Sequence, residues 1–433
     1  VVIRDPDAAG NSRGYAGRLL DAAPTYGEDN LRGVEAVLGG DSGRRLSYLD
    51  AFRIDGTEST AVALVMRGRD SLHPDLLVET RHAVEPSVDH LTVTTRLTNT
   101  GADTIPETDL GDRILWGRAS AFAPGVPAGE TAVPFLLATG SGVAYGWVGR
   151  SMTSAVPREP RATPVEYPVP QLPPGAVHEV TRRLLIVPES DEGRVLAAGW
   201  EEVAQATGRV HVRTREPGDD PAPGAEVSIR NEQGILVARG TTSPTGEVEL
   251  PVPPGTVEVT VMDPRRGTER VSGVVVEPRE ARSLEIELPR PAELELTARD
   301  DRGEPSPARW ILEGILGTPT PFLGPADRGP AAGNSILAPS GERRVQVPPG
   351  RYRALAARGP GFEIWEKEIE AKPGKTVSLA AELTAIAIPE GWVAADLRPH
   401  TLDREGCTVS REDRVQSLVC EGLRWAALLA GDP

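Results

Sequence analysis

Apolar and polar residues alternate at period two over much of the chain, which is the pattern of strands that bury one face. The clearest example runs from Ser59 to Asn99, where STAVALVMRG, DLLVETRHAVE and DHLTVTTRLTN follow one another. The last two segments are joined across Pro86-Ser87 and predict an antiparallel hairpin. This part of the chain is therefore expected to form an antiparallel sheet.

The same alternation extends the predicted sheet to residues 1–205, called the first block below. Further strands are predicted at Gly142–Val148 and Val177–Val187, and a short helix at Leu196–Ala204 closes the block. These elements together predict a large antiparallel sandwich.

An internal repeat follows the first block. GRVHVRTREPGDDPAPGAEVSI aligns with AELELTARDDRGEPSPARWIL, PVPPGTVEVTV with QVPPGRYRALA, and SLEIEL with SLAAEL. The offset is 84 residues between Pro221 and Pro305 and 95 residues between Ser283 and Ser378. The second copy must therefore carry about eleven extra residues, and the Gly- and Pro-rich stretch 314–333 supplies them as a loop insertion.

Each copy consists of short alternating segments separated by Pro/Gly turns, which predicts a small β-sandwich. The copies are residues 206–290, module 1, and residues 291–386, module 2. Both resemble the carboxypeptidase-regulatory-like, transthyretin-like sandwich family over most of 206–385. This resemblance implies modules that act as spacers or adhesive units.

Residues 387–433, the terminal unit, have a different pattern. An apolar run at Trp392–Leu397 precedes a helix start at Ser410, whose apolar face would be Val415, Leu418 and Val419. A second strand is predicted at Trp425–Ala430. Two strands joined by a helix should be parallel, and parallel strands are normally buried inside a larger sheet. Another chain, the rest of a longer polypeptide or one of the sandwiches must then complete this β-α-β unit.

The terminal unit resembles the start of the metal-binding domain of exported PHP-type metallohydrolases, the CehA/McbA-like branch. That domain opens with Gly-Trp and Asp-Leu-His-x-His-Ser/Thr, and its second strand ends in Thr-Asp-His. Asp396, Leu397, His400 and Thr401 match this pattern, whereas Arg398 stands in place of the first His. The chain ends Gly-Asp432-Pro, so a proline replaces another metal-binding His.

The first block carries a second part of the same resemblance. LTVTTRLTNTGADTIPETDLGDRILWGR is similar to the supersandwich (mutarotase-like) segment that precedes the metal domain in that family. The resemblance thus implies four domains: the supersandwich at 1–205, the two modules, and a degenerate start of a PHP-like domain at 387–433.

The replaced histidines argue against catalysis by the chain as written. The family's site needs several imidazole and carboxylate ligands on divalent metal, and neither a guanidinium nor a proline offers a lone pair. We therefore expect no enzyme activity and no cofactor. His400 and Asp432 would be vestigial metal ligands, and Asp396 and Arg398 would lie beside that site or bind an anion. If the chain is instead the front of a larger PHP-type phosphoesterase, Zn, Mn or Fe is implied.

Composition excludes several other function classes. The net charge is −16, the pI is about 5.0, and lysine occurs only at positions 367, 372 and 375, so we expect no nucleic-acid partner. No run of about 18 apolar residues occurs, so no membrane span is expected. The two cysteines, Cys407 and Cys420, are too few for a disulfide framework. The chain begins with Val rather than Met, which predicts processing, trimming or a longer polypeptide.

These observations favour a non-catalytic, exported structural or binding protein in the periplasm or at the cell surface. The first alternative is the front of a larger metal-dependent hydrolase. The second is a carbohydrate-binding or sugar-epimerase-like first block, in which His73, His82 and His90 are the acid–base candidates. Trp116, Tyr145 and Trp147 are the candidates for contact with a sugar, although aromatic residues in a sandwich are more often core.

Overall fold

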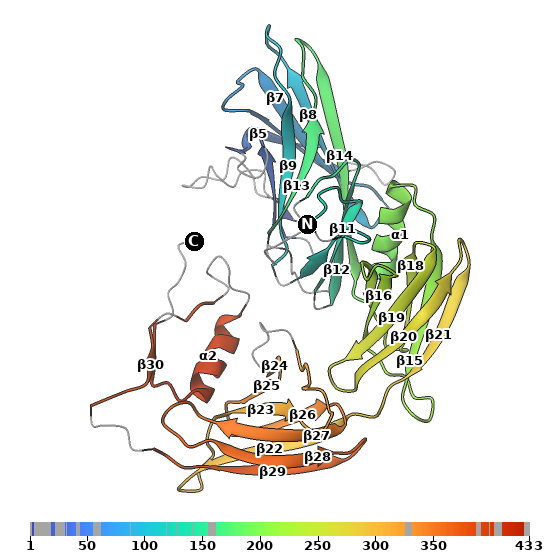
Figure 1. Cartoon of the computed structure of the whole chain (residues 1–433). Coiled ribbons are helices and arrows are strands. Elements are labelled where there is room, and N and C mark those ends of the chain that lie inside the picture. Colours follow the sequence, from blue (N-terminus) through green and yellow to red (C-terminus); the bar gives the residue numbers. More distant parts are fainter. Residues whose placement is uncertain are drawn as a thin grey trace.

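The computed structural model consists mainly of β-strands, which confirms the predicted mainly β, multidomain sandwich fold (Figure 1). The residues that the structure describes are 2–3, 19–21, 31, 33–39, 44–54, 62–86, 88–117, 119–127, 129–140, 142–154, 162–324, 331–386, 391–397, 399–401 and 409–427.

The first block contains strands β1 to β14 and helix α1. Their bounds are β1 (Val2–Ile3), β2 (Leu19–Asp21), β3 (Gly33–Leu38), β4 (Arg44–Arg45), β5 (Ser47–Ile54), β6 (Val62–Arg69), β7 (Leu76–Val84), β8 (His90–Asn99), β9 (Thr108–Leu115), β10 (Ser120–Phe122), β11 (Phe135–Gly140), β12 (Val143–Gly149), β13 (Ala162–Val169), β14 (Val177–Pro188) and α1 (Glu192–Glu202).

Two sheets form the first block. One has the order β10-β11-β12-β14-β8-β7-β6-β5, and the other has the order β1-β2-β3-β9-β13 with β4 beside β3. The predicted hairpin is present as antiparallel β7 and β8, in which Leu76 lies opposite Asn99. Helix α1 begins at Glu192, four residues before the predicted start at Leu196. The prediction missed its first turn because that turn has no apolar periodicity.

Modules 1 and 2 have the same strand order. Module 1 contains β15 (Gly208–Arg215), β16 (Glu226–Asn231), β17 (Leu236–Thr241), β18 (Glu247–Val252), β19 (Gly255–Asp263), β20 (Gly267–Val276) and β21 (Ala281–Glu287). Module 2 contains β22 (Ala292–Asp300), β23 (Ala308–Gly314), β24 (Ala331–Ala332), β25 (Ser335–Ala338), β26 (Glu342–Val347), β27 (Gly350–Ala357), β28 (Trp365–Ala371) and β29 (Thr376–Leu383).

Each module packs a three-stranded sheet against a larger one. The sheets of module 1 are β18-β15-β21 and β17-β16-β19-β20, and those of module 2 are β26-β22-β29 and β24-β25-β23-β27-β28. The register also repeats, since His211 lies opposite Ser283 and Glu295 lies opposite Ser378 in the two parallel pairs. Strand β24, which lies near the end of the inserted stretch 314–333, is the addition that distinguishes module 2.

The apolar core is continuous from the first block into module 1, whereas module 2 has a separate core. Helix α1 lies between the first block and module 1 (Figure 1). A Cβ at Gly199 would lie 2.3 Å from the ring of Phe135 in the first block, and a Cβ at Gly193 would lie 2.4 Å from the carbonyl oxygen of Glu249 in module 1. The two glycines therefore let one helix approach both domains closely.

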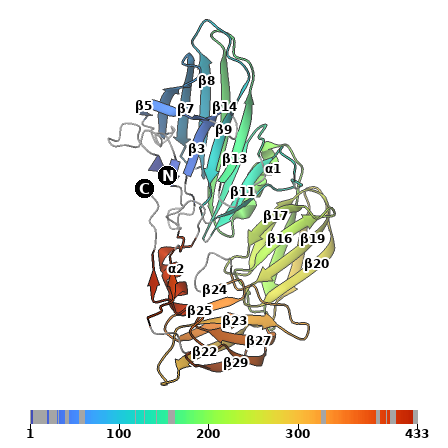
Figure 2. The same ribbon diagram turned by 60° about the vertical axis from the view of Figure 1, so that its left-hand side comes forward.

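The terminal unit contains β30 (Ala395–Asp396), α2 (Arg411–Cys420) and β31 (Trp425–Ala426). The two strands are parallel, as predicted, and Ala395 lies opposite Trp425. The hydroxyl of Ser410 accepts a 3.0 Å hydrogen bond from the backbone N–H of Asp413 and so begins the helix. In the two views the first block and the modules form a curved row, with the terminal unit on its concave side (Figure 2). Among the described helices, none is long and apolar enough to cross a bilayer.

Candidate functional site

The structure places two of the four candidate metal-site residues. Asp396 is half-buried in β30, opposite Ala426, and His400 is half-buried on the segment that follows. The backbone carbonyl of His400 accepts a 2.9 Å hydrogen bond from Nε of Arg414 in α2. Arg398 and Asp432 lie outside the described residues. Within the described ranges, no three His, Cys, Asp or Glu side chains are grouped so that they could hold a metal ion.

The terminal unit exposes several apolar residues of its predicted helix face and strands. In α2, Val415 is 46% exposed and Val419 is 39% exposed. Beside the strands, Trp392, Leu397 and Trp425 are 73%, 66% and 55% exposed. Of the predicted apolar helix face, Val415 and Val419 are thus exposed, whereas Leu418 is half-buried. We call these five side chains the exposed apolar residues of the terminal unit.

Helix α2 instead packs on module 2 through its C-terminal end. Cys420 is the buried residue of this helix, and burial raises the pKa of its thiol to about 11, so it acts as a small apolar group. Glu421 forms a 2.7 Å ion pair with Arg309 of β23. A Cβ at Gly422 would lie 2.5 Å from the carbonyl oxygen of Arg358, so the chain passes module 2 at backbone contact distance.

The three histidines of the first block do not form one accessible acid–base set. His82 is buried on β7, where burial, followed by the charge of Arg182, lowers its pKa to about 3. His73 lies outside the sheet and its Nδ1 is 2.9 Å from Asp70, while His90 lies 3.5 Å from Asp89. Since His82 is neutral and shielded from solvent at physiological pH, it is not available to a sugar.

The aromatic candidates for carbohydrate contact are also in the core. The side chains of Trp116, Tyr145 and Trp147 are completely or almost completely buried. The indole N–H of Trp147 donates a 2.7 Å hydrogen bond to the hydroxyl of Tyr167, which itself is buried. These aromatic residues therefore stabilise the sandwich and present no face to a sugar ring.

A buried ion pair between the two sheets was not found by sequence reasoning. Arg182 on β14 donates through Nε and Nη2 to the carboxylate of Asp112 on β9, and through Nη1 to the hydroxyl of Thr95. Thr95 in turn shares a 3.0 Å hydrogen bond with Thr80. Residues so far apart in sequence give no periodic or spacing signal, so only the fold brings them together.

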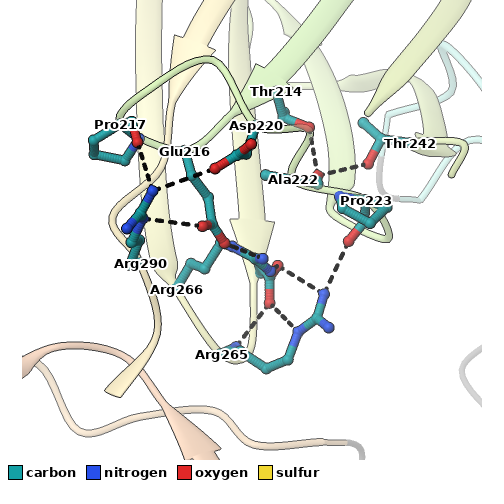
Figure 3. Close-up of polar contacts among 11 residues, drawn as sticks. Thr214, Glu216, Pro217, Asp220, Ala222, Pro223, Thr242, Arg265, Arg266 and Arg290 are labelled. Carbon is teal, nitrogen blue, oxygen red and sulfur yellow. Dashed lines mark hydrogen bonds and ion pairs between the residues drawn. The ribbon is translucent and has the colours of Figure 1, made fainter. Parts of the chain in front are cut away.

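A second polar network lies at the end of module 1 from which module 2 follows (Figure 3). The buried carboxylate of Asp263 accepts hydrogen bonds from the guanidinium groups of Arg265 and Arg266. Arg266 also donates to Glu216 on the opposite side of the sandwich end. Charge-assisted bonds of this kind are short and directional, so they fix the loops that carry them.

Arg290, in the linker between the modules, extends this network. Its guanidinium donates to the carbonyl oxygen of Pro217 at 3.1 Å and to Asp220 at 3.3 Å, and its Nε lies 3.5 Å from Glu216 (Figure 3). A Cβ at Gly374 of module 2 would lie 3.7 Å from Cδ of Arg290. One side chain thus lies between the two modules at their junction.

A comparison with known protein families gives a match to module 1. The family of carboxypeptidase regulatory-like domains matches residues 207–289, in agreement with the predicted resemblance of this module. Among curated proteins, none matches the sequence.

Solved structures give weak likenesses. The minor pilin GBS52 of Streptococcus agalactiae is 14% identical, with 42% of this chain and 98% of the pilin covered at a TM-score of 0.28. The shaft pilin SpaA of Lactobacillus rhamnosus GG is 13% identical, with 42% and 99% covered at a TM-score of 0.24. The alpha-galactosidase of Lactobacillus brevis is 12% identical, with 47% of this chain and 36% of the enzyme covered at a TM-score of 0.28. The match thus spans about a third of that enzyme. None of these likenesses assigns a function.

Proposed function

We propose that this chain is a non-catalytic structural or binding protein whose sandwiches support the terminal unit and whose terminal unit docks with another polypeptide segment. The observation that carries this proposal is a parallel pair of two-residue strands in a unit that also has exposed apolar residues on the strand segments and on α2. A parallel pair of this length is not stable in water by itself, because both its edges and its faces need cover.

The way in which the terminal unit is held supports the same proposal. Cys420 and Glu421 fix the C-terminal end of α2 on module 2, while Val415 and Val419 remain exposed on the same helix. The helix is therefore held in place without covering its apolar residues. A segment that adds strands beside β30 or β31 would bury them and pair the strand edges.

The occupant is a polypeptide that supplies β-strands, either from another chain or from a continuation of this one. Export to the periplasm or the cell surface remains part of this proposal. The acidic composition and the scarcity of lysine are compatible with a protein–protein role and disfavour nucleic acid.

Site-specific photo-crosslinking in the native cells tests this docking. A photoreactive phenylalanine analogue in place of Trp425 should crosslink to a strand-forming segment. That segment should belong either to another chain or to the part of the same chain that follows residue 427. The matched control is the analogue at Val275, which is similarly exposed on the edge strand β20. If position 425 reacts only with module 2, or no more than position 275 does, the docking proposal is wrong.

A metal-dependent hydrolase is the second candidate, because Asp396 and His400 lie on one segment that leads out of a parallel strand. In that case the complete protein would hold Zn, Mn or Fe with further ligands. The intact mass and the metal content of the native protein distinguish the two candidates. Stoichiometric metal in a larger protein that loses metal on His400→Ala would favour the hydrolase, whereas a metal-free protein would contradict it.

A further inference from the structure

Helix α1 joins the first block to module 1, and the burial of its first residue is unusual. Glu192 is fully buried, together with the apolar residues Val195 and Leu196 of the same helix. Neither carboxylate oxygen of Glu192 makes a hydrogen bond of normal geometry, although the backbone N–H groups of Glu192, Thr241 and Ser190 lie near the carboxyl. A buried polar group without a partner is rare in proteins and costs free energy, so it needs an explanation.

The Glu192 carboxyl faces module 1. A Cβ at Gly240 of β17 would lie 3.3 Å from Oε2 of Glu192, so the carboxyl lies against this strand. The same strand makes two further hydrogen bonds to the first block. The backbone N–H of Gly125 donates to the carbonyl oxygen of Leu236, and the guanidinium of Arg239 donates to the carbonyl oxygen of Ser120.

Charged groups surround this carboxyl on several elements, but none neutralises it directly. Glu189, which precedes the helix, accepts from the N–H of Gly142 and from Thr241 and adds negative charge. Arg239 on β17 is the cation that acts on Glu192 through space, and Glu226 on β16 shares it. Arg239 already stacks on Phe122, 4.8 Å from the ring centre.

Three other charged groups belong to the helix or to β18. Asp191 and Arg194 lie on the same helix end, where Arg194 pairs with Asp89. Glu249 of β18 pairs with Arg209 at 3.4 Å. These groups, together with His211 of β15 and Glu247 of β18, line the cleft between α1 and module 1, where the ion pairs compensate the charges of Asp191, Arg194 and Glu249.

We propose that Glu192 makes the junction between the first block and module 1 sensitive to pH. The protonated carboxyl keeps α1 and β17 in contact. Ionisation places an unpaired charge in the junction, so the two domains separate more often. This inference is independent of the docking of the terminal unit, because it concerns the other end of the modules.

The direction of the effect follows from the burial of the group. Burial, the largest cause, and the charge of Glu189 raise the pKa of Glu192 to about 7, although backbone N–H groups near it, including those of Thr241 and Ser190, oppose part of this rise. An acid whose pKa is higher in the closed form than in the open form stabilises the closed form at low pH. That stabilisation is lost as pH rises from about 4.5 through about 7.

Amide hydrogen exchange of the intact protein tests the proposal at Gly125 and in β17, where the junction hydrogen bonds lie. After correction for intrinsic exchange, the opening constant should rise roughly 10- to 100-fold between pH 5 and pH 8. Glu192→Gln, which has the same shape and no charge, should abolish most of this rise. Glu192→Leu serves as a second neutral variant.

Glu201→Gln is the matched control, because it removes the same charge from an exposed position of the same helix. It should keep the pH dependence of the wild-type protein. The proposal is overturned if the wild-type opening constant does not rise over this range, or if the Glu192 variants show the same rise as the control.

Discussion

Arg182 and Asp112 form a bidentate ion pair between the two sheets of the first block, with both hydrogen bonds 2.7 Å long. Both side chains are almost completely buried. The pair joins β14 of one sheet to β9 of the other, and Thr95 satisfies a further donor of the guanidinium. Two charges can be held inside a core only when pairing and hydrogen bonding compensate their lost hydration, as they do here.

Removing one partner of this pair should strongly destabilise the first block. Asp112→Asn leaves the Arg182 guanidinium buried without its counter-charge, so we expect a loss of about 3–5 kcal/mol in the free energy of unfolding. Calorimetry of the intact protein would measure this as a lower transition temperature for the first block. The control is Glu79→Gln, which breaks a 2.7 Å pair with Arg67 at the surface and should change stability by about 0–1 kcal/mol. Equal effects of the two substitutions would contradict this account.

His82 should make the first block sensitive to acid. Its pKa is about 3 in the folded protein and 6.5 in the unfolded chain, so the unfolded state binds more protons between these values. Neutral His82 therefore makes its full contribution to the stability of the first block above about pH 6.5, and this contribution is lost as pH falls toward 3. The transition temperature of the first block should therefore decrease from pH 6.5 to pH 4, and His82→Gln should reduce this decrease. His178→Gln, at a half-buried position of β14, should not change it.

The strands were predictable from sequence because their cause is local. In β7 and β8, alternate side chains are buried, as period-two alternation requires when a strand covers a core. The repeat was predictable for the same reason, since equal turns and equal alternation produced the same pairing of His211 with Ser283 and of Glu295 with Ser378.

The polar contacts were not predictable, because they join residues that only the fold brings together. Arg182 lies 70 residues from Asp112, and nothing in the local pattern marks either as buried. Glu192 likewise lies before the helix predicted at Leu196–Ala204, and nothing in the local pattern marks it as buried. The metal-site prediction for His400 and Asp432 came from a resemblance and remains a prediction.

Arg290 should set the orientation of module 2 relative to module 1. Its guanidinium binds Pro217 and Asp220 of module 1, while its aliphatic stem lies beside Gly374 of module 2. Arg290→Ala should therefore widen the distribution of distances between spin labels on the exposed strands β20 and β28. Arg282→Ala, on the exposed strand β21, is the control and should leave the distribution unchanged. An unchanged distribution in Arg290→Ala would show that the linker backbone alone fixes the orientation.

The contact between α2 and module 2 should depend on Gly422. This residue has φ +66°, and a Cβ there would lie 2.5 Å from the carbonyl oxygen of Arg358, which cannot move without disturbing module 2. Gly422→Ala should therefore release the end of α2 and expose Cys420, which would then react faster with a thiol reagent in the folded protein.

Gly391→Ala separates this steric effect from backbone strain. Gly391 has φ +82° in the same terminal unit, but a Cβ there would meet nothing within 4 Å. The substitution should cost on the order of 1 kcal/mol locally, because a side chain disfavours positive φ, and should leave Cys420 protected. Cys420 is packed beside β23 and β25 of module 2, so its labelling rate reports on this contact. Faster labelling in Gly422→Ala but not in Gly391→Ala would show that the contact depends on the close approach at Gly422. Equal labelling in both variants would mean that the helix is held elsewhere.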